Sequence, residues 1–433
     1  MGLVERTGWG LYQGAMAVGL MAAAPALLAF RGRHYLQTLP GRLGLRNAPA
    51  ADPGTVWIHA VSVGEVAVAA TLADSLGNSP LLVTTVTPTG QEQAQKRFAG
   101  PGRRVAYLPF DLGFAVEKFF RRHRPRLLVL VEGDYWPLVL RAARRHDVPV
   151  VVVNGRVGDR SARRLARFAR WSQTLFFDAV DLFAVQTEAD RECLLAAGAK
   201  PDRVQVTGNL KFDTRPPTGK PELESAVATL ADGRPILIAG STMAGEDDAV
   251  LDAFESLGGG ERALLVLVPR HPERWDDVAR RIERRGVAGL RRSALDLDSP
   301  SRERPDVLLL DSLGELAALY RLARGAFIGG TLVPTGGHNP LEPASFGVPV
   351  VVGPSMDNFR DMARRFDEAE AWSRVDDATG LAQVWAAWLD DESQAEQLGA
   401  RALRLLEDNR GAVARTTALL EPFLDTARPE GPR

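Results

Sequence analysis

Cysteine is almost absent from this 433-residue chain, which contains only Cys193. A disulfide framework and a cysteine-based metal site are therefore both excluded. A surplus of charge is missing too: the formal net charge is −1, which gives no general attraction to nucleic acid. Low-complexity tracts and internal repeats are also absent, and with 45% hydrophobic and 25% charged residues the composition is that of a folded protein. Neither a Walker A sequence nor a Gly-x-Gly-x-x-Gly turn occurs, which disfavours kinases and dehydrogenases.

One long uncharged run lies near the start, with no charged residue between Arg6 and Arg31. As a helix, its roughly 24 residues would extend about 36 Å, enough to cross a bilayer. Three interpretations remain open: a membrane anchor, a cleaved signal peptide and a buried core helix. Trp9 and Tyr12 near one end, with basic residues after the other, favour a retained anchor with the body of the protein on the cytoplasmic side. Pro25 disfavours cleavage by a signal peptidase.

The rest of the chain is long enough for two domains. Short runs rich in Val and Leu alternate with helical segments, which predicts parallel sheets covered on both faces. The polar, proline-rich segment 213–221 separates two such series, so we expect two doubly wound halves with a ligand-binding cleft between them. The expected strands are 56–60, 81–85, 104–108, 127–131, 148–154, 182–186 and 203–207, then 235–239, 263–268, 286–290, 307–310, 325–330 and 348–353.

Two strand-to-helix loops carry the clearest chemistry: 59–65 (HAVSVGE) and 336–342 (GGHNPLE). In an open α/β sheet such loops lie at the carboxyl ends of the strands, where ligands bind. Glu65 is a candidate catalytic base at the start of a helix, after a sharp turn permitted by Gly64. The alternative is that Glu65 only complements the helix dipole. Further hydroxyls and carboxylates follow other strands, in 84–90 (TTVTPTG) and 132–137 (EGDYWP), which suits a polyhydroxylated substrate.

Basic residues gather at two places. Arg160, Arg163, Arg164, Arg167 and Arg170 have helical spacing, which predicts either a solvated basic face or a contact with phosphates or anionic lipid headgroups. Farther along, Arg270 and His271 follow one expected strand, Ser241 and Thr242 follow another, and Lys211 precedes the linker. The Gly336-Gly337 turn precedes a further expected helix. Cations, backbone amides and a carboxylate for ribose hydroxyls together predict a site for a nucleotide monophosphate.

Taken in order, the motifs resemble the 3-deoxy-D-manno-octulosonic acid (Kdo) transferases of lipopolysaccharide synthesis. The matching segments are 57–65 (WIHAVSVGE), 84–90 (TTVTPTG), 153–156 (VNGR) with 160–163 (RSAR), 207–213 (TGNLKFD), 239–242 (AGST), 268–274 (VPRHPER) and 332–343 (LVPTGGHNPLEP). The resemblance implies a GT-B fold and an inverting, metal-independent transfer of Kdo from CMP-Kdo to a lipid A precursor, lipid IVA. It also implies attachment to the cytoplasmic face of the inner membrane. No cofactor and no nucleic acid partner is expected, and the oligomeric state stays open.

The resemblance makes Glu65 the catalytic base and divides the chain into an anchor (1–31), an acceptor-binding domain (32–213), a CMP-Kdo-binding domain (222–405) and a C-terminal helix and tail (406–433). The expected donor-binding residues are Lys211, Ser241, Thr242, Arg270, His271, Gly336, Gly337, His338, Asn339 and Glu342. The expected acceptor-binding residues are Ser62, Gly64, Thr85, Thr87, Glu132, Arg156, Arg160, Arg163 and Arg164, and no metal ligand is expected.

The chain departs from the family pattern at Gly133-Asp134, at Met243-Ala244 and at Gly353–Met356. Two rival functions remain: a GT-B enzyme that uses a UDP-sugar, and a non-catalytic sugar-nucleotide binder.

Overall fold

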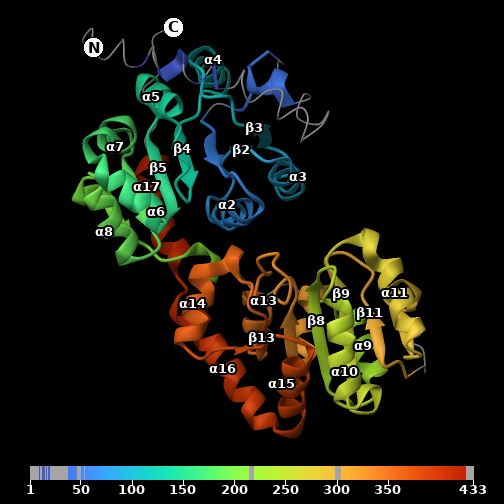
Figure 1. The fold of residues 1–433 in the computed structure, drawn as a ribbon. Coiled ribbons are helices and arrows are strands. Elements are labelled where there is room, and N and C mark those ends of the chain that lie inside the picture. Colours follow the sequence, from blue (N-terminus) through green and yellow to red (C-terminus); the bar gives the residue numbers. More distant parts are fainter. Residues whose placement is uncertain are drawn as a thin grey trace. The chain divides into compact units, whose positions relative to one another are not determined.

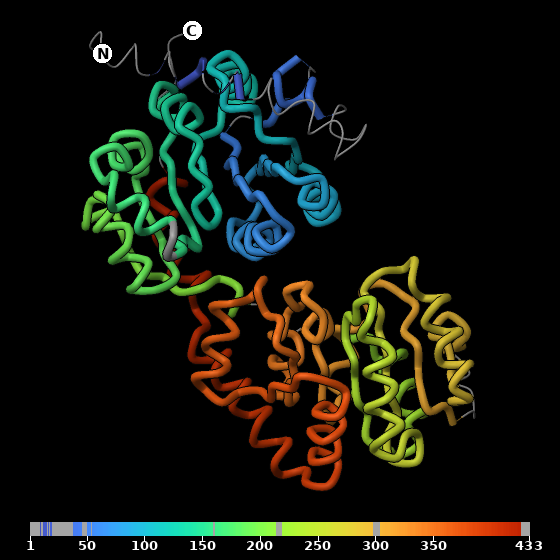
Figure 2. The backbone as a smooth tube through the Cα atoms, viewed as in Figure 1, coloured from blue at the N-terminus to red at the C-terminus, as the bar shows by residue number. Residues whose placement is uncertain are grey.

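The structure is a computed structural model that describes residues 9, 12–14, 16, 18–19, 38–45, 50–52, 54–213, 219–297 and 304–425. Most of the expected anchor (1–31), linker residues 214–218 and the side chain of Arg160 therefore lie outside the described residues. Within the described ranges, no helix is long and apolar enough to cross a membrane. The chain forms two compact units: residues 1–213 with 410–433, and residues 214–409 (Figures 1 and 2).

The N-terminal unit is built on a parallel sheet of seven strands in the order β3-β2-β1-β4-β5-β6-β7. The order reverses between β1 and β4, so the loops that follow these two strands lie side by side at the carboxyl edge, the usual ligand-binding position. The strands are β1 (Val56–His59), β2 (Leu81–Thr85), β3 (Arg103–Tyr107), β4 (Leu127–Val131), β5 (Val150–Gly155), β6 (Leu182–Val185) and β7 (Val204–Val206).

Helices cover both faces of this sheet because alternate strand residues point to opposite sides. Trp57, for example, belongs to the apolar core beneath α4, α5 and α8, whereas Ile58 belongs to the core beneath α2, α3 and α17. The helices are α2 (Val63–Ser75), α3 (Pro88–Arg97), α4 (Gly113–His123), α5 (Pro137–Arg145), α6 (Asp159–Arg167), α7 (Ala169–Leu175), α8 (Glu188–Ala196) and α17 (Ala412–Asp425), with 3-10 turns η1 (Phe177–Ala179), η2 (Pro201–Arg203) and η3 (Leu210–Asp213).

The last helix, α17, returns to the N-terminal unit, where its red tube lies among the green segments (Figure 2), and it packs on α2 and η3. Asp213 accepts hydrogen bonds from the backbone amides of Gly411, at 2.6 Å, and Val413 at the start of α17. The boundary expected between 405 and 406 falls inside α16 (Glu392–Asp408), so the chain leaves the C-terminal unit only after that helix.

The C-terminal unit repeats the architecture, with a parallel sheet in the order β10-β11-β9-β8-β12-β13-β14. Here the order reverses between β8 and β12. The strands are β8 (Ile236–Thr242), β9 (Leu264–Pro269), β10 (Gly289–Arg291), β11 (Val307–Leu309), β12 (Ala323–Ile328), β13 (Val350–Val352) and β14 (Ser373–Arg374). The helices are α9 (Pro221–Ala231), α10 (Asp247–Ser256), α11 (Trp275–Arg284), α12 (Leu316–Leu319), α13 (Leu341–Ala344), α14 (Arg360–Glu368), α15 (Ala378–Asp390) and α16, with 3-10 turns η4 (Gly259–Glu261), η5 (Pro272–Arg274), η6 (Arg292–Ala294), η7 (Tyr320–Leu322) and η8 (Asp357–Phe359).

The thirteen strands expected from apolar runs correspond to β1 to β13. β14 was not expected, because two residues, one of them the exposed Arg374, leave no apolar run in the sequence.

Candidate active site

Glu65 lies in the first turn of α2, at the carboxyl edge of the N-terminal sheet. Ser62 is the N-cap of this helix, and its hydroxyl accepts a hydrogen bond from the Glu65 amide at 3.4 Å. The Glu65 side chain folds back over the cap: Oε1 accepts from Ser62 Oγ at 2.9 Å, and Oε2 accepts from the Val61 amide at 2.7 Å. This reciprocal arrangement is a variant of the capping box, in which Glu65 accepts from the amide of Val61, one residue before the N-cap, and it holds the carboxylate in one orientation.

The surroundings of Glu65 favour its protonated form more than water does. Burial raises the pKa of the Glu65 carboxyl, and the charge of Glu132 raises it further. Hydrogen bonds from Val61 and Ser62 and the proximity of His59 oppose this change, but the net direction is upward. A carboxylate with a raised pKa is a stronger base, which is the property that general-base catalysis requires.

Glu132, at the end of β4, is held between two cations. It has a left-handed backbone (φ 63°), and its carboxylate accepts from Lys211 Nζ at 2.9 Å and from Arg156 Nε at 3.0 Å. Asn154 helps to position Lys211. Its Oδ1 accepts a hydrogen bond from the Leu210 amide at 2.9 Å, and Leu210 begins η3, the turn that carries Lys211. Lys211, expected among the donor residues, thus lies in the N-terminal unit and pairs with an expected acceptor residue.

A second carboxylate follows β4 and contacts the loop after β1. Asp134 Oδ2 is 3.3 Å from His59 Nε2 and accepts from Trp136 Nε1 at 2.7 Å. The other ring nitrogen of His59 lies 2.9 Å from the Thr84 hydroxyl. Although burial acts in the opposite direction, the hydrogen bond and charge of His59 lower the pKa of Asp134. The Asp134 side chain, at a position where the chain departs from the family pattern, therefore joins β1 and β4 at the reversal point of the sheet.

Several residues expected to bind the acceptor form hydrogen bonds within the fold or lie inside a helix instead. Thr85 is fully buried and its hydroxyl donates to Gln91 Oε1 at 2.6 Å, so it is not available to a substrate. Thr87 caps α3 and donates to the Val61 carbonyl at 3.0 Å, which holds two loops together. Gly64 lies inside the first turn of α2 without a positive φ, so the sharp turn predicted there is absent.

The expected arginine face is interrupted. α6 ends at Arg167, and Phe168, with φ −118° and ψ 37°, separates it from α7. Arg163, Arg164 and Arg167 are exposed on α6, whereas Arg170 belongs to α7. No carboxylate within the described part of the chain pairs with any of these four arginines.

In the C-terminal unit, the Gly336-Gly337 turn does not offer the amides expected for a phosphate. Both glycines have positive φ, and a side chain at either position would collide with neighbouring atoms. The Gly336 amide donates to Ser355 Oγ at 3.0 Å and the Gly337 amide to the Gly330 carbonyl at 2.8 Å. The helix that follows, α13, has only four residues, so its dipole is weak.

Two loops of the C-terminal unit, one after β12 and one after β9, present side chains suited to a ligand. Burial, followed by the charges of Arg270 and His271, lowers the pKa of His338 to about 4, so its imidazole is neutral at physiological pH. Its Nε2 is buried and has no hydrogen-bond partner among the described residues. Arg270 is exposed, and no carboxylate in those same ranges forms an ion pair with it. Asn339 Nδ2 lies 3.4 Å from Glu342 Oε1.

Ser241 and Thr242 end β8, beside β12 at the other reversal point. Ser241 has a left-handed backbone with φ 58°. Thr242 is fully buried, and its hydroxyl donates to Asp247 Oδ1 at 2.7 Å, so it cannot contact a donor as expected. Across the described ranges, no group of three or more His, Cys, Asp or Glu side chains is placed to hold a metal ion.

Comparisons with known proteins identify the family. A family model described as 3-deoxy-D-manno-octulosonic-acid transferase (kdotransferase) matches residues 37–214. A 3-deoxy-D-manno-octulosonic acid transferase from Haemophilus influenzae is 34% identical over 407 residues, which cover 92% of this chain and 94% of that protein. Its counterpart from Bordetella pertussis is 37% identical over 398 residues, or 89% of this chain and 90% of that protein. The chain belongs to the Kdo transferase family.

The solved structures agree on the fold. A glycosyltransferase from Rickettsia africae, only 12% identical, covers 87% of this Kdo transferase homologue and 100% of its own chain with a TM-score of 0.55. The expected pair of parallel-sheet α/β domains, which resemble those of GT-B glycosyltransferases, is confirmed.

One important residue of this Kdo transferase family member was not predicted. Glu246 is fully buried and accepts four backbone hydrogen bonds: from Met243 at 2.8 Å, Gly330 at 2.6 Å, Thr331 at 2.9 Å and Leu332 at 2.9 Å. It thereby ties the loop after β8 to the loop after β12. The sequence signal was weak, because an acidic residue before an apolar helix usually caps that helix.

Proposed function

We propose that this chain transfers Kdo from CMP-Kdo to a hydroxyl of a lipid A precursor, with Glu65 as the general base. The observation that carries the proposal is the Glu65 carboxyl itself: it is fixed by a capping box at the carboxyl edge of the sheet, and burial raises its pKa. Membership of the Kdo transferase family supplies the reaction class.

The proposed step is a single displacement with inversion. Glu65 removes the proton of the acceptor hydroxyl while that oxygen attacks the anomeric carbon of Kdo. The bond between this carbon and the phosphate oxygen breaks, and CMP leaves with the electron pair. General-base assistance of this kind accelerates a reaction by roughly 10²–10⁴-fold.

The donor is doubly anionic, since it carries a phosphodiester and the Kdo carboxylate. In this proposal, Arg270 and His338 of the C-terminal unit meet these charges, and no metal ion takes part. The exposed Arg270 supplies a cation, and the buried Nε2 of His338 lacks one hydrogen-bond partner among the described residues, which a bound donor can provide.

The test is an assay of the full chain with CMP-Kdo and tetra-acylated lipid A precursor, followed by mass spectrometry of the lipid. We expect Glu65→Gln to lower kcat by about 10²–10⁴-fold while CMP binding, measured by calorimetry, stays unchanged. Glu92→Gln is the matched control, because Glu92 is exposed and its one ion-pair partner in the described part of the chain is Lys96, at 2.7 Å. Activity of Glu65→Gln within about tenfold of wild type would remove Glu65 from the base role. Turnover of a UDP-sugar in place of CMP-Kdo would overturn the donor assignment.

We also propose that residues 1–31 attach the protein to the cytoplasmic face of the inner membrane. The uncharged run supports this proposal. Trp9 and Tyr12, expected at a membrane interface, contact the N-terminal unit: Tyr12 Oη donates to Asp111 Oδ2 at 2.7 Å, and Arg141 lies 4.6 Å from the centre of the Trp9 ring. These two contacts are therefore not part of the support for the anchor. Deletion of residues 1–31 should release the protein from anionic vesicles at high salt, which screens any remaining basic surface. Sedimentation of the truncated protein with vesicles at high salt would contradict the anchor.

A further inference from the structure

A partly buried arginine, Arg274, holds together the two loops that carry Ser241 and Arg270. Thr242, at the end of β8, is the junction. Its carbonyl oxygen accepts the backbone amide of Arg270 at 3.0 Å and Nη1 of Arg274 at 2.8 Å. Its hydroxyl donates to Asp247 Oδ1 at 2.7 Å. Thr242 thus connects the end of β8, the loop after β9 and the start of α10.

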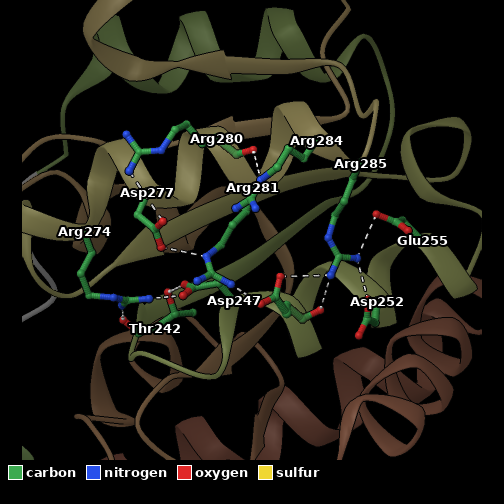
Figure 3. Close-up of polar contacts among 11 residues, drawn as sticks. Thr242, Asp247, Asp252, Glu255, Arg274, Asp277, Arg280, Arg281, Arg284 and Arg285 are labelled. Atoms are coloured by element: carbon green, nitrogen blue, oxygen red, sulfur yellow. Dashed lines mark hydrogen bonds and ion pairs between the residues drawn. The ribbon is translucent and has the colours of Figure 1, made fainter.

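Arg274 completes the junction by pairing with the other oxygen of Asp247 (Figure 3). Only 16% of the Arg274 side chain and 2% of the Asp247 side chain are exposed. Burial raises the pKa of Asp247, although Thr242 and Arg274 counteract this effect. A buried pair of this kind is costly to break, because removal of one partner leaves the other charge without compensation.

The planar guanidinium of Arg274 therefore forms two interactions. One is with the carbonyl of Thr242, and the other is with the carboxylate of Asp247 at the start of α10. A lysine can neutralise Asp247, but its ammonium is a single point charge and does not reproduce two hydrogen bonds in fixed directions. Ser241, which precedes the junction, has the unfavourable φ of 58°, so the loop needs such support to keep its conformation.

We propose that Arg274 is a positioning residue for the donor: together with Asp247 it locks the loops that present Ser241 and Arg270 to the anionic part of CMP-Kdo. This inference rests on the proposed function, because it takes CMP-Kdo as the ligand of these loops. Arg274 itself touches no substrate in this role. Its loss lets Arg270 move from the place where it meets the donor.

Arg285, which follows α11 directly, provides a matched control. Figure 3 shows the Arg285 side chain directed toward Asp252 and Glu255 rather than toward Thr242. Its Nη1 lies 2.6 Å from Asp252 and 3.3 Å from Glu255, and its Nη2 lies 3.1 Å from Asp248, the neighbour of Asp247 on α10. Arg285→Gln thus removes ion pairs of the same type but none of the hydrogen bonds that join Thr242, Asp247 and Arg274.

The experiment compares the full-length wild type with Arg274→Gln, Arg274→Lys and Arg285→Gln. Calorimetry gives the Kd of CMP, steady-state kinetics give KM for CMP-Kdo and for the lipid acceptor, and thermal unfolding gives Tm. We expect Arg274→Gln to raise the Kd of CMP and the KM of CMP-Kdo by about tenfold or more, the usual effect of one charge-assisted hydrogen bond. The KM of the acceptor should stay within about twofold, Arg274→Lys should recover only part of the CMP affinity, and Arg285→Gln should bind CMP as wild type does.

Binding of CMP to Arg274→Gln within about twofold of wild type would overturn the positioning role. Equal increases in donor and acceptor KM with a lower Tm would also overturn it, since they indicate a general loss of structure. If Arg274→Gln does not fold, Thr242→Val carries the same test, because it removes only the hydroxyl bond to Asp247. If the wild type binds a UDP-sugar instead of CMP, the proposed function fails, and the same variants then test the junction with UDP.

Discussion

At the scale of single residues, the pKa of Glu65 links the capping box to the pH dependence of the reaction. The base must be ionised, and burial raises its pKa, so activity should fall as the pH decreases through a value above that of an ordinary glutamate. Full activity is expected above this pKa, and progressive loss below it. The check is a profile of kcat/KM between about pH 4 and pH 9, covering the range in which perturbed carboxyl groups titrate. An acidic limb at the ordinary glutamate value, or one that persists in Glu65→Gln, would contradict the assignment.

Two glycines near Glu65 give a second prediction at this scale. A Cβ on Gly90 would lie 2.9 Å from the Val61 carbonyl oxygen and 2.8 Å from Thr87 Oγ1, whereas a Cβ on Gly64 would meet nothing closer than 3.9 Å. Gly90→Ala should therefore destabilise the protein by roughly 1–3 kcal/mol, as overpacking does. It should also lower kcat, because the Val61 amide holds Glu65. Gly64→Ala is the control, and urea unfolding should show no destabilisation. Equal free energies of unfolding for the two variants would show that the close approach of Gly90 to Val61 does not limit the side chain at position 90.

Among the helices, α6 carries a basic surface on the N-terminal unit. Arg163, Arg164 and Arg167 are exposed and have no acidic partner within the described residues, so an external anion such as a phosphate would offset their mutual repulsion. Replacement of all three by Gln should lower kcat/KM for a bis-phosphorylated lipid A precursor by about tenfold or more, if one charge-assisted contact is lost.

The affinity for CMP should not change in this triple variant, because α6 belongs to the other unit. A dephosphorylated precursor provides the control. Equal losses with both acceptors would show that these arginines serve the fold or the membrane rather than the acceptor phosphates.

At the scale of the whole molecule, the C-terminal helix completes the N-terminal unit. Ala412 and Leu420 of α17 are fully buried in the core that also contains Leu72 and Leu210. A variant that ends at Asn409 exposes the part of this core that α17 covers. It also removes the Gly411 and Val413 amides that donate to Asp213. The N-terminal unit should lose roughly 5 kcal/mol or more of stability, since each buried leucine alone is worth about 2–5 kcal/mol.

Calorimetry of this truncated variant should show a lower unfolding temperature for one of two transitions, while CMP still binds the C-terminal unit. Asp213→Asn should give a smaller change in the same transition. An unchanged thermogram for the truncated protein would mean that α17 contributes no stability to the N-terminal unit.

The local elements could be predicted from the order of residues along the chain. Continuous Val- and Leu-rich runs predicted the strands because a sheet covered on both faces accepts apolar residues at every position. The helix start at Glu65 was predicted for an equally local reason, whereas the bonds that Glu65 forms with Val61 and Ser62 came from the structure. The family motifs also placed the candidate residues at the carboxyl edges of the two sheets, for the same reason: each motif follows a strand directly.

Which of these side chains remain available to a ligand depends on packing between elements far apart in the chain. Thr85 and Thr242 follow strands as a binding residue does, yet the packing of α3 and α10 buries them and uses their hydroxyls. Lys211 pairs with Glu132, 79 positions earlier in the chain, and Glu246 binds amides more than 80 positions away. Such partners depend on how strands are ordered in a sheet, and periodicity along the chain carries no information about that order.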